Sequence, residues 1–283
     1  MLAALPRDDS GEVTGEPATF MSCIIQRMES QHLSGSVLGA VVLAAGTCVF
    51  AEGRPLAEWK GYAGAGAFAY PKYTGARATE TIAAPLLMFE YKETMYVDLL
   101  RAGVRFWSNA DRSLAIGLAA EPRFGFRSGD GVRLGGMATR RDSIELGPSL
   151  EWESPALSLN LAWFGDASGT SRGSSLRGAV YRQFIDSSRW DVGGYVGFDR
   201  ASAKVVNYYF GVRGDEAAAA RPFYQPGVAT HWSLGLSAAY RINERYAVLF
   251  GVQGTRLGGA AASSPIAETR SANIGYLGLG WRL

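Results

Sequence analysis

Histidine and cysteine are the side chains with which this chain could most readily perform nucleophilic or metal chemistry, and its 283 residues include only two of each. Cys23, His32 and Cys48 lie near the N-terminus, which leaves His231 as the one histidine of the rest of the chain. A histidine acts as a general base only with a nucleophile within hydrogen-bond reach. No Gly-x-Ser-x-Gly turn accompanies His231, so the sequence predicts no catalytic residue.

The acidic residues and the glycine clusters indicate no binding site either. Asp98 and the pair Asp215 and Glu216 lack the spaced partners that a metal ion requires. The stretches "GYAGAGAF" at 61–68 and "GLGW" at 278–281 lie inside alternating segments with no helix after them. Close packing of strands therefore explains them better than a phosphate-binding loop. We expect no cofactor-binding or metal-binding residue, and a protein that is not an enzyme.

Alternation of apolar with small or polar residues is the dominant pattern of the chain. In "HWSLGLSAAYRI", the apolar residues from Trp232 to Ile242 share one parity, and the small and polar residues from Ser233 to Arg241 share the other. A period of two is typical of a β-strand, whose successive side chains leave opposite faces. We predict twelve strands, at 60–70, 82–91, 94–107 (with a kink at Gly103), 113–126, 143–152, 156–163, 175–184, 189–198, 205–212, 231–242, 245–257 and 272–283.

Strand length and aromatic placement favour a transmembrane barrel over a soluble β-sandwich. Most segments have the roughly 9 to 11 residues that a tilted strand needs to cross the hydrocarbon layer. An even number of strands joined by alternating short turns and longer loops can close into an antiparallel barrel. We expect His231, beside Trp232, to hydrogen-bond to lipid headgroups. Aromatic residues near strand ends suit the girdles at the two membrane interfaces: Trp152, Trp163, Phe184, Trp190, Trp232, Tyr246 and Trp281.

One continuous apolar run, Gly35 to Ala51, precedes the strands. It is too short and too rich in small residues for a spanning helix, and its end, Val49-Phe50-Ala51, fits the small-x-small rule of a signal-peptidase site. Residues 1–51 are therefore predicted to be an N-terminal extension plus signal peptide that is removed. Residues 52–283 are predicted to form the outer-membrane β-barrel.

The composition of the leader bears on the start codon and on the charge of the mature chain. Acidic residues before Met21 are unfavourable in a signal peptide, which favours a translation start at Met21 or Met28. The stretch "LAAGTC" leaves lipidation at Cys48 as an alternative to cleavage after Ala51. Cleavage after Ala51 removes both cysteines and two arginines against five acidic residues, so the net charge rises from +2 to +5. This mild positive charge suits anionic lipid or glycan and is too small to indicate nucleic-acid binding.

Charged residues of both signs fall on the face of the strands that we predict to point into the lumen. Such a set permits either a wet pore or a network of ion pairs that plugs the lumen, and mixed sign favours the plug, because a selective pore usually shows a ring of like charges. The predicted inward charges are Glu121, Arg123, Glu145, Glu151, Arg177, Asp191, Asp199 and Arg241.

The C-terminal half resembles the MltA-interacting protein MipA/OmpV family. The residues that carry the resemblance are Tyr208, Tyr209, Gly211 and Val212, then Tyr224, Pro226 and Gly227, then Leu257, Gly258, Ser264, Pro265 and Ile266. The likeness extends over residues 57–283 and is strongest after Asn207. The chain departs from the pattern at Phe210, an extra residue in the first motif, and at Leu283, where outer-membrane barrels prefer Phe or Trp.

The resemblance implies an outer-membrane protein of a Gram-negative bacterium, similar to one described as a scaffold in peptidoglycan assembly. The partners that it implies are a lytic murein transglycosylase and a bifunctional murein synthase, together with outer-membrane lipid and lipopolysaccharide. An outer-membrane channel for small solutes is the alternative function. Conductance across a planar bilayer distinguishes the two.

Overall fold

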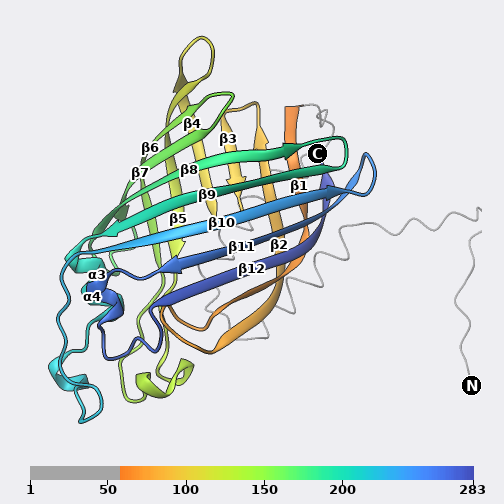
Figure 1. Ribbon diagram of the computed structural model, residues 1–283. Helices are drawn as coiled ribbons and strands as arrows, with labels where there is room; N and C mark the ends of the chain where they lie inside the picture. The colour runs from red at the N-terminus through yellow and green to blue at the C-terminus, as the bar shows by residue number, and fades with distance from the viewer. Residues whose placement is uncertain (1–57) are drawn as a thin grey trace, which may run out of the picture.

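The computed structural model of the protein describes residues 58–283 (Figure 1). In this part of the chain, twelve antiparallel strands form a closed barrel in which each strand pairs with the next and β12 closes against β1. The all-β barrel predicted from the alternation is thus confirmed, whereas the predicted signal peptide lies outside the described residues. The strands are β1 (Trp59–Pro71), β2 (Thr79–Tyr91), β3 (Met95–Asp98), β4 (Arg101–Ser108), β5 (Leu114–Arg123), β6 (Ser143–Glu153), β7 (Ser158–Asp166), β8 (Ser174–Asp186), β9 (Trp190–Ala201), β10 (Ala229–Arg241), β11 (Tyr246–Arg256) and β12 (Ser271–Arg282).

Two predicted strands were wrong, although the total of twelve is right. The segment 94–107 is not one strand with a kink at Gly103. It is the hairpin β3–β4, which turns at Leu99 and Leu100. The segment 205–212 forms helix α3 (Ala203–Phe210), whose buried residues include Val205, Val206 and Tyr209. Short apolar runs suit a buried helix as well as a strand, so their length and period alone do not separate the two.

The two faces of the wall have the character that the alternation predicts. On β10, Trp232, Leu234 and Leu236 are exposed on the outside, whereas Gly235 is buried on the inside. A continuous apolar surface of this size is unfavourable in water and is typical of the lipid-facing surface of a membrane barrel. Aromatic pairs lie near both ends of the strands: Phe198 with Trp232 at one end, and Trp190 with Tyr240 and Tyr246 with Trp281 at the other.

Glycines let β1 and β12 pack closely on the inner face. A Cβ atom on Gly64 would lie 1.9 Å from the carbonyl oxygen of Leu279, and one on Gly278 would lie 2.5 Å from that of Ala65. The space above this glycine surface holds the fully buried side chain of Leu86, whose Cδ1 atom is 2.9 Å from the Cβ position of Gly278. The glycine clusters therefore serve strand packing, as the sequence indicates.

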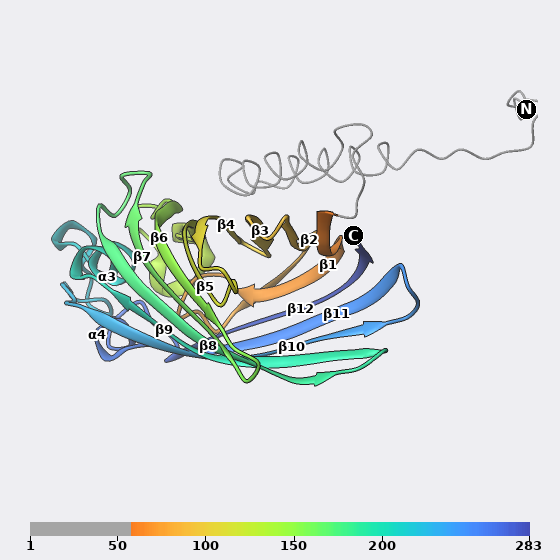
Figure 2. The ribbon, with the colours of Figure 1, turned by 90° about the horizontal axis from the view of Figure 1, so that it is seen from above.

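The long connections all lie at one end of the barrel. Turns of three to five residues join the strands at the end where the C-terminus lies, and five longer loops join them at the other end, where Figures 1 and 2 show α3 and α4 (Gly259–Ala262). In outer-membrane barrels the long loops are external and the short turns periplasmic. Short helices η2 (Ser128–Asp130), η3 (Val132–Leu134) and η4 (Gly214–Glu216) lie within these loops.

Candidate functional site

The described part of the chain presents two unusual polar arrangements, one inside the barrel and one in the loops. Within residues 58–283, no three His, Cys, Asp or Glu side chains converge closely enough to hold a metal ion. Across the same residues, no helix has the length and apolar character needed to span a bilayer. The candidate site is therefore the charged lumen together with the loops above it.

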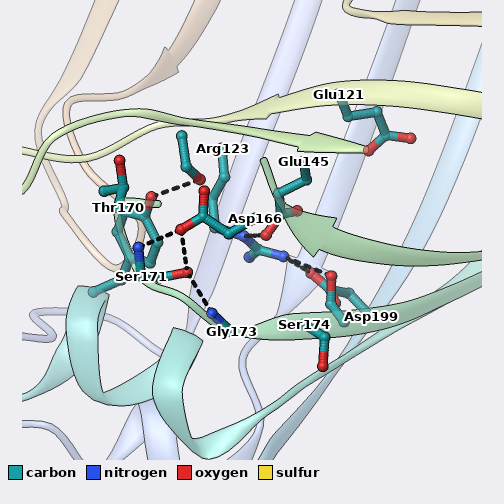
Figure 3. A network of polar contacts seen from close by, with 12 residues as sticks. Glu121, Arg123, Glu145, Asp166, Thr170, Ser171, Gly173, Ser174 and Asp199 are labelled. Atoms are coloured by element: carbon teal, nitrogen blue, oxygen red, sulfur yellow. Dashed lines mark hydrogen bonds and ion pairs between the residues drawn. The ribbon is translucent and has the colours of Figure 1, made fainter. Parts of the chain in front are cut away.

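An ion-pair network joins β5, β6, β8 and β9 inside the lumen, near its external end. Arg123 donates to Glu145 at 2.8 Å and to Asp199 at 2.8 Å (Figure 3). Arg177 contacts Glu121, Glu145 and Asp199. Glu121 and Glu145 lie directly opposite each other on β5 and β6, where two like charges would repel. The guanidinium of Arg177 reaches across from β8 and contacts both carboxylates, which removes that repulsion.

Aromatic and further charged side chains also lie in the lumen. Phe164 on β7 is fully buried, and its ring lies 4.8 Å from the guanidinium carbon of Arg177 and 5.7 Å from that of Arg101. Such contacts are favourable because the face of the ring attracts a cation. Towards the periplasmic end, Arg105 pairs with Glu151 at 2.7 Å and with Glu90 at 3.3 Å.

All eight charges predicted to face inward take part in these interior ion pairs. The two not yet mentioned, Asp191 and Arg241, form a pair at 3.8 Å. Sequence reasoning missed Glu90, Arg101 and Arg105. The two arginines lie in the segment 94–107, which the sequence predicts to be a single strand. In the observed β3–β4 hairpin, both residues face inward.

The loops pack into a compact cap over the external end of the barrel. The cap comprises the loops 72–78, 124–142, 167–173, 202–228 and 257–270. Two buried apolar clusters hold it together, one around Val206 and Phe210 and the other around Tyr73, Leu134 and Ile266. A core of this kind makes the cap a folded unit.

The residues that carry the family resemblance build this cap. The Tyr224 hydroxyl donates to the carbonyl of Ala260 at 2.7 Å, and the Ser264 hydroxyl donates to that of Phe210 at 2.5 Å. Val212 pairs with Tyr224 through backbone hydrogen bonds. The three motifs, which lie far apart in the sequence, therefore meet in one place.

A buried ion pair between Arg140 and Glu216 joins two loops of the cap. The guanidinium donates to both carboxylate oxygens, at 2.7 and 2.6 Å, and the backbone N–H groups of Ala138 and Arg213 add bonds of 3.0 and 3.1 Å. Burial opposes ionisation of Glu216, but these hydrogen bonds outweigh it and lower the pKa of that carboxyl to about 2. Glu216, which was weighed as a metal ligand, thus has a structural ion-pair partner that the sequence did not reveal.

His231 is an inward residue, so its predicted place among the headgroups is wrong. Its side chain is 6% exposed, stacks on Phe210 at 6.0 Å, and accepts a 3.3 Å hydrogen bond from the N–H of Gly258 at Nδ1. Trp232, the next residue, faces outward, and neighbours on a strand must face opposite sides. The alternation therefore predicts an inward side chain for His231, which lies under the cap.

A closed antiparallel barrel with an apolar outer belt, aromatic residues at both ends and a charged interior defines a transmembrane barrel of the bacterial outer membrane. The chain belongs to the family of the MltA-interacting protein MipA, whose model matches residues 63–283.

Two relatives and one solved structure illustrate the similarity. The outer membrane protein Omp26La of Vibrio anguillarum is 29% identical over 193 residues, which cover 65% of this chain and 72% of that protein. The outer membrane protein OmpV of Vibrio cholerae serotype O1 is 28% identical with the same coverage of 65% and 72%. The structure of NanC porin covers 79% of this chain and 100% of its own, at 12% identity and a TM-score of 0.40.

Proposed function

We propose that this outer-membrane protein is a closed scaffold that holds a lytic murein transglycosylase and a bifunctional murein synthase at its periplasmic end. The family takes its name from an interaction with MltA, a lytic transglycosylase. A scaffold of this kind needs exposed turns and a stable frame, and it needs neither a reacting group nor an open pore.

The ion-pair network of the lumen is the observation that carries the proposal. Arg101, Arg123 and Arg177 pair with Glu121, Glu145 and Asp199, so the positive and negative charges of these six paired groups balance. A balanced network gives no field that selects ions of one sign. Together with the cap, it supports a barrel that is closed to solutes along its axis.

The periplasmic surface offers small polar contacts to a partner. The β2–β3 turn and the start of β1 carry charges of both signs there, including the exposed pairs Lys60 with Glu93 and Lys92 with Glu58. Surfaces of this kind suit a weak, reversible interface with a soluble enzyme better than a permanent apolar one.

Site-directed photocrosslinking tests the partner. A photoreactive phenylalanine analogue at Ser188, in the exposed β8–β9 turn, should capture a murein transglycosylase or synthase in envelopes, whereas the same group at the exposed Asp215 of the cap should not. Capture of neither enzyme at Ser188 or at the four other periplasmic turns would refute the scaffold. In planar bilayers the purified chain should give no steady single-channel current, and such currents would favour the solute channel.

We also propose that lipopolysaccharide is the lipid partner at the external rim. A polar cleft of about 460 Å³ at the external ends of β1, β2 and β12 includes Arg77, Thr79 and Arg270 in its lining. Two arginines beside the outer leaflet suit the phosphates of that lipid. Replacement of Arg77 and Arg270 by Gln should reduce lipopolysaccharide retained by the purified barrel, and unchanged retention would contradict the assignment.

A further inference from the structure

The barrel wall is interrupted on its external side between β2 and β5. The two strands that separate β2 from β5 are short: β3 pairs only with Met88–Tyr91 of β2, and β4 pairs with β5 only over Ala115–Ala120. The hairpin turn at Leu99 and Leu100 therefore ends partway along β2, as Figure 1 shows. Beyond it, the stretch 79–86 of β2 pairs with β1 alone.

Four structural elements frame this interruption, which we call the side window. Its sides are the stretch 79–86 of β2 and Glu121–Arg123 of β5, and its periplasmic border is the turn at Leu99 and Leu100. At its external border two loops of the cap meet, where the rings of Tyr73 and Phe126 lie 5.9 Å apart. The window therefore opens sideways, in the part of the wall that faces the outer leaflet.

The edge of β2 that borders the window is unsuited to a further strand. The carbonyl of Leu87 accepts a hydrogen bond of 2.7 Å from the N–H of Leu99, so the backbone groups of Leu87 point towards β3. In a strand, the backbone N–H and C=O groups of alternate residues point the same way. The backbone groups of Pro85, Ala83 and Thr81 therefore point into the window. Pro85 has no N–H to donate, which blunts this edge against strand addition.

The β3–β4 hairpin, which forms the periplasmic border of the window, contains a strained backbone conformation. Leu99 has a φ of +53°, a left-handed conformation that is strained for a bulky residue, and neither Leu99 nor Leu100 is a residue type that usually occupies the centre of a turn. The buried Nη2 atom of Arg101 also has no hydrogen-bond partner among the described residues. A strained residue and an unpartnered polar atom therefore both lie at this border of the window.

On the β1–β2 side, the interior behind the window is apolar, although barrel interiors are usually polar. Phe68 and Ile82 lie opposite each other on β1 and β2 and face inward, yet both are only half-buried. The space in front of them is therefore not filled by the residues that the structure describes. Phe68 and Leu99 both pack against the buried cluster that contains Leu86.

We propose that the side window admits an acyl chain of an outer-leaflet lipid, which lies against Phe68, Ile82 and Leu99 inside the barrel. An acyl chain matches the apolar inner surface and needs no hydrogen bonds from a blunted edge. The cap closes the axial route at the external end, so on that side the opening leads into the membrane. The proposal is independent of any murein partner.

Photocrosslinking to lipid tests this route. The full chain carries a benzophenone side chain at Phe68 or at Ile82 and is reconstituted into phosphatidylethanolamine vesicles with labelled acyl chains. Tyr181, an inward residue of β8 away from the window, is the negative control, and the outward Leu236 is the positive control. Heat-modifiable migration in gels verifies that each variant is folded.

Adducts on the acyl chain at Phe68 and Ile82, close to the yield at Leu236 and several times that at Tyr181, would support the side window. Yields no higher than that at Tyr181 would overturn it, and so would equal yields at all inward positions or adducts confined to the headgroup. Ala83→Trp at the window edge should lower the adduct at Ile82. Ala67→Trp, which pairs with Ala83 and faces lipid on β1, should leave it unchanged, and an equal loss in both would also overturn the proposal.

Discussion

Replacing Glu216 by Gln should loosen the cap and leave the barrel folded. The pKa of Glu216 falls from its ordinary 4.5 to about 2 in the folded chain, and at about 1.4 kcal/mol for each tenfold change this corresponds to about 3 kcal/mol. Removal of one member of a buried ion pair costs about 3 to 5 kcal/mol in other proteins, which gives the same magnitude. Gln retains an oxygen that can accept one of the bonds, so about 3 kcal/mol is the expected loss.

Hydrogen exchange of the folded barrel in detergent measures this loss directly. The N–H of Ala138, which donates to Glu216, should exchange about 100-fold faster in Glu216→Gln. Asp215→Asn, at an exposed neighbouring carboxylate, is the control and should leave exchange unchanged. The reasoning would be refuted by equal protection in both variants, or by equal loss in both.

The pH dependence of the same exchange gives a second check on Glu216. Because the folded pKa is the lower one, the stabilisation is complete above pH 4.5 and is lost as the pH falls towards 2. The protection of Ala138 in the wild-type cap, corrected for intrinsic exchange rates, should therefore decline over this interval. In Glu216→Gln it should not depend on pH there.

Three further predictions concern the wall and the leader. Leu236→Arg, on the lipid face, should cost about 2 to 4 kcal/mol of barrel stability on refolding into lipid, whereas Ser237→Arg, on the inner face, should cost far less; equal costs would contradict the assigned faces. The folded chain should migrate differently in gels with and without boiling, because a closed hydrogen-bonded sheet resists unfolding in detergent; identical migration would argue against a closed barrel. N-terminal sequencing of the envelope form should begin at or near Glu52, and a lipid-bearing Cys48 would overturn the predicted cleavage.

The sequence revealed the parts of the fold that depend on a regular period. Alternation identified ten full strands, and parity placed Arg123, Glu145 and Arg177 correctly in the lumen, because neighbouring side chains on a strand must face opposite sides. It could not reveal the β3–β4 hairpin, since Leu99 and Leu100 are apolar and are not turn residues. The alternation also predicts a strand where the structure has helix α3, because burial between loops outweighs the β-propensity of Val205 and Val206 there.

The ion pairs of the cap were beyond sequence reasoning for a different physical reason. Arg140 and Glu216 lie 76 residues apart, and nothing in the period of either loop brings them together. Their contact depends on how five loops fold over one another. Loop conformations of this length are set by tertiary packing and not by local propensity.

The family motifs lie at the end of the barrel opposite to the one that a murein enzyme would contact. Tyr209, Tyr224 and Ser264 all lie in the cap at the external end, where their hydrogen bonds fix the loops to one another and to the barrel. A murein enzyme would approach from the periplasm and meet the short turns at the opposite end. The motifs therefore account for the fold of the cap, and a scaffold function must depend on turn residues such as Ser188. Disruption of the cap by Glu216→Gln should accordingly leave crosslinks at Ser188 unchanged, because the barrel wall separates the two ends.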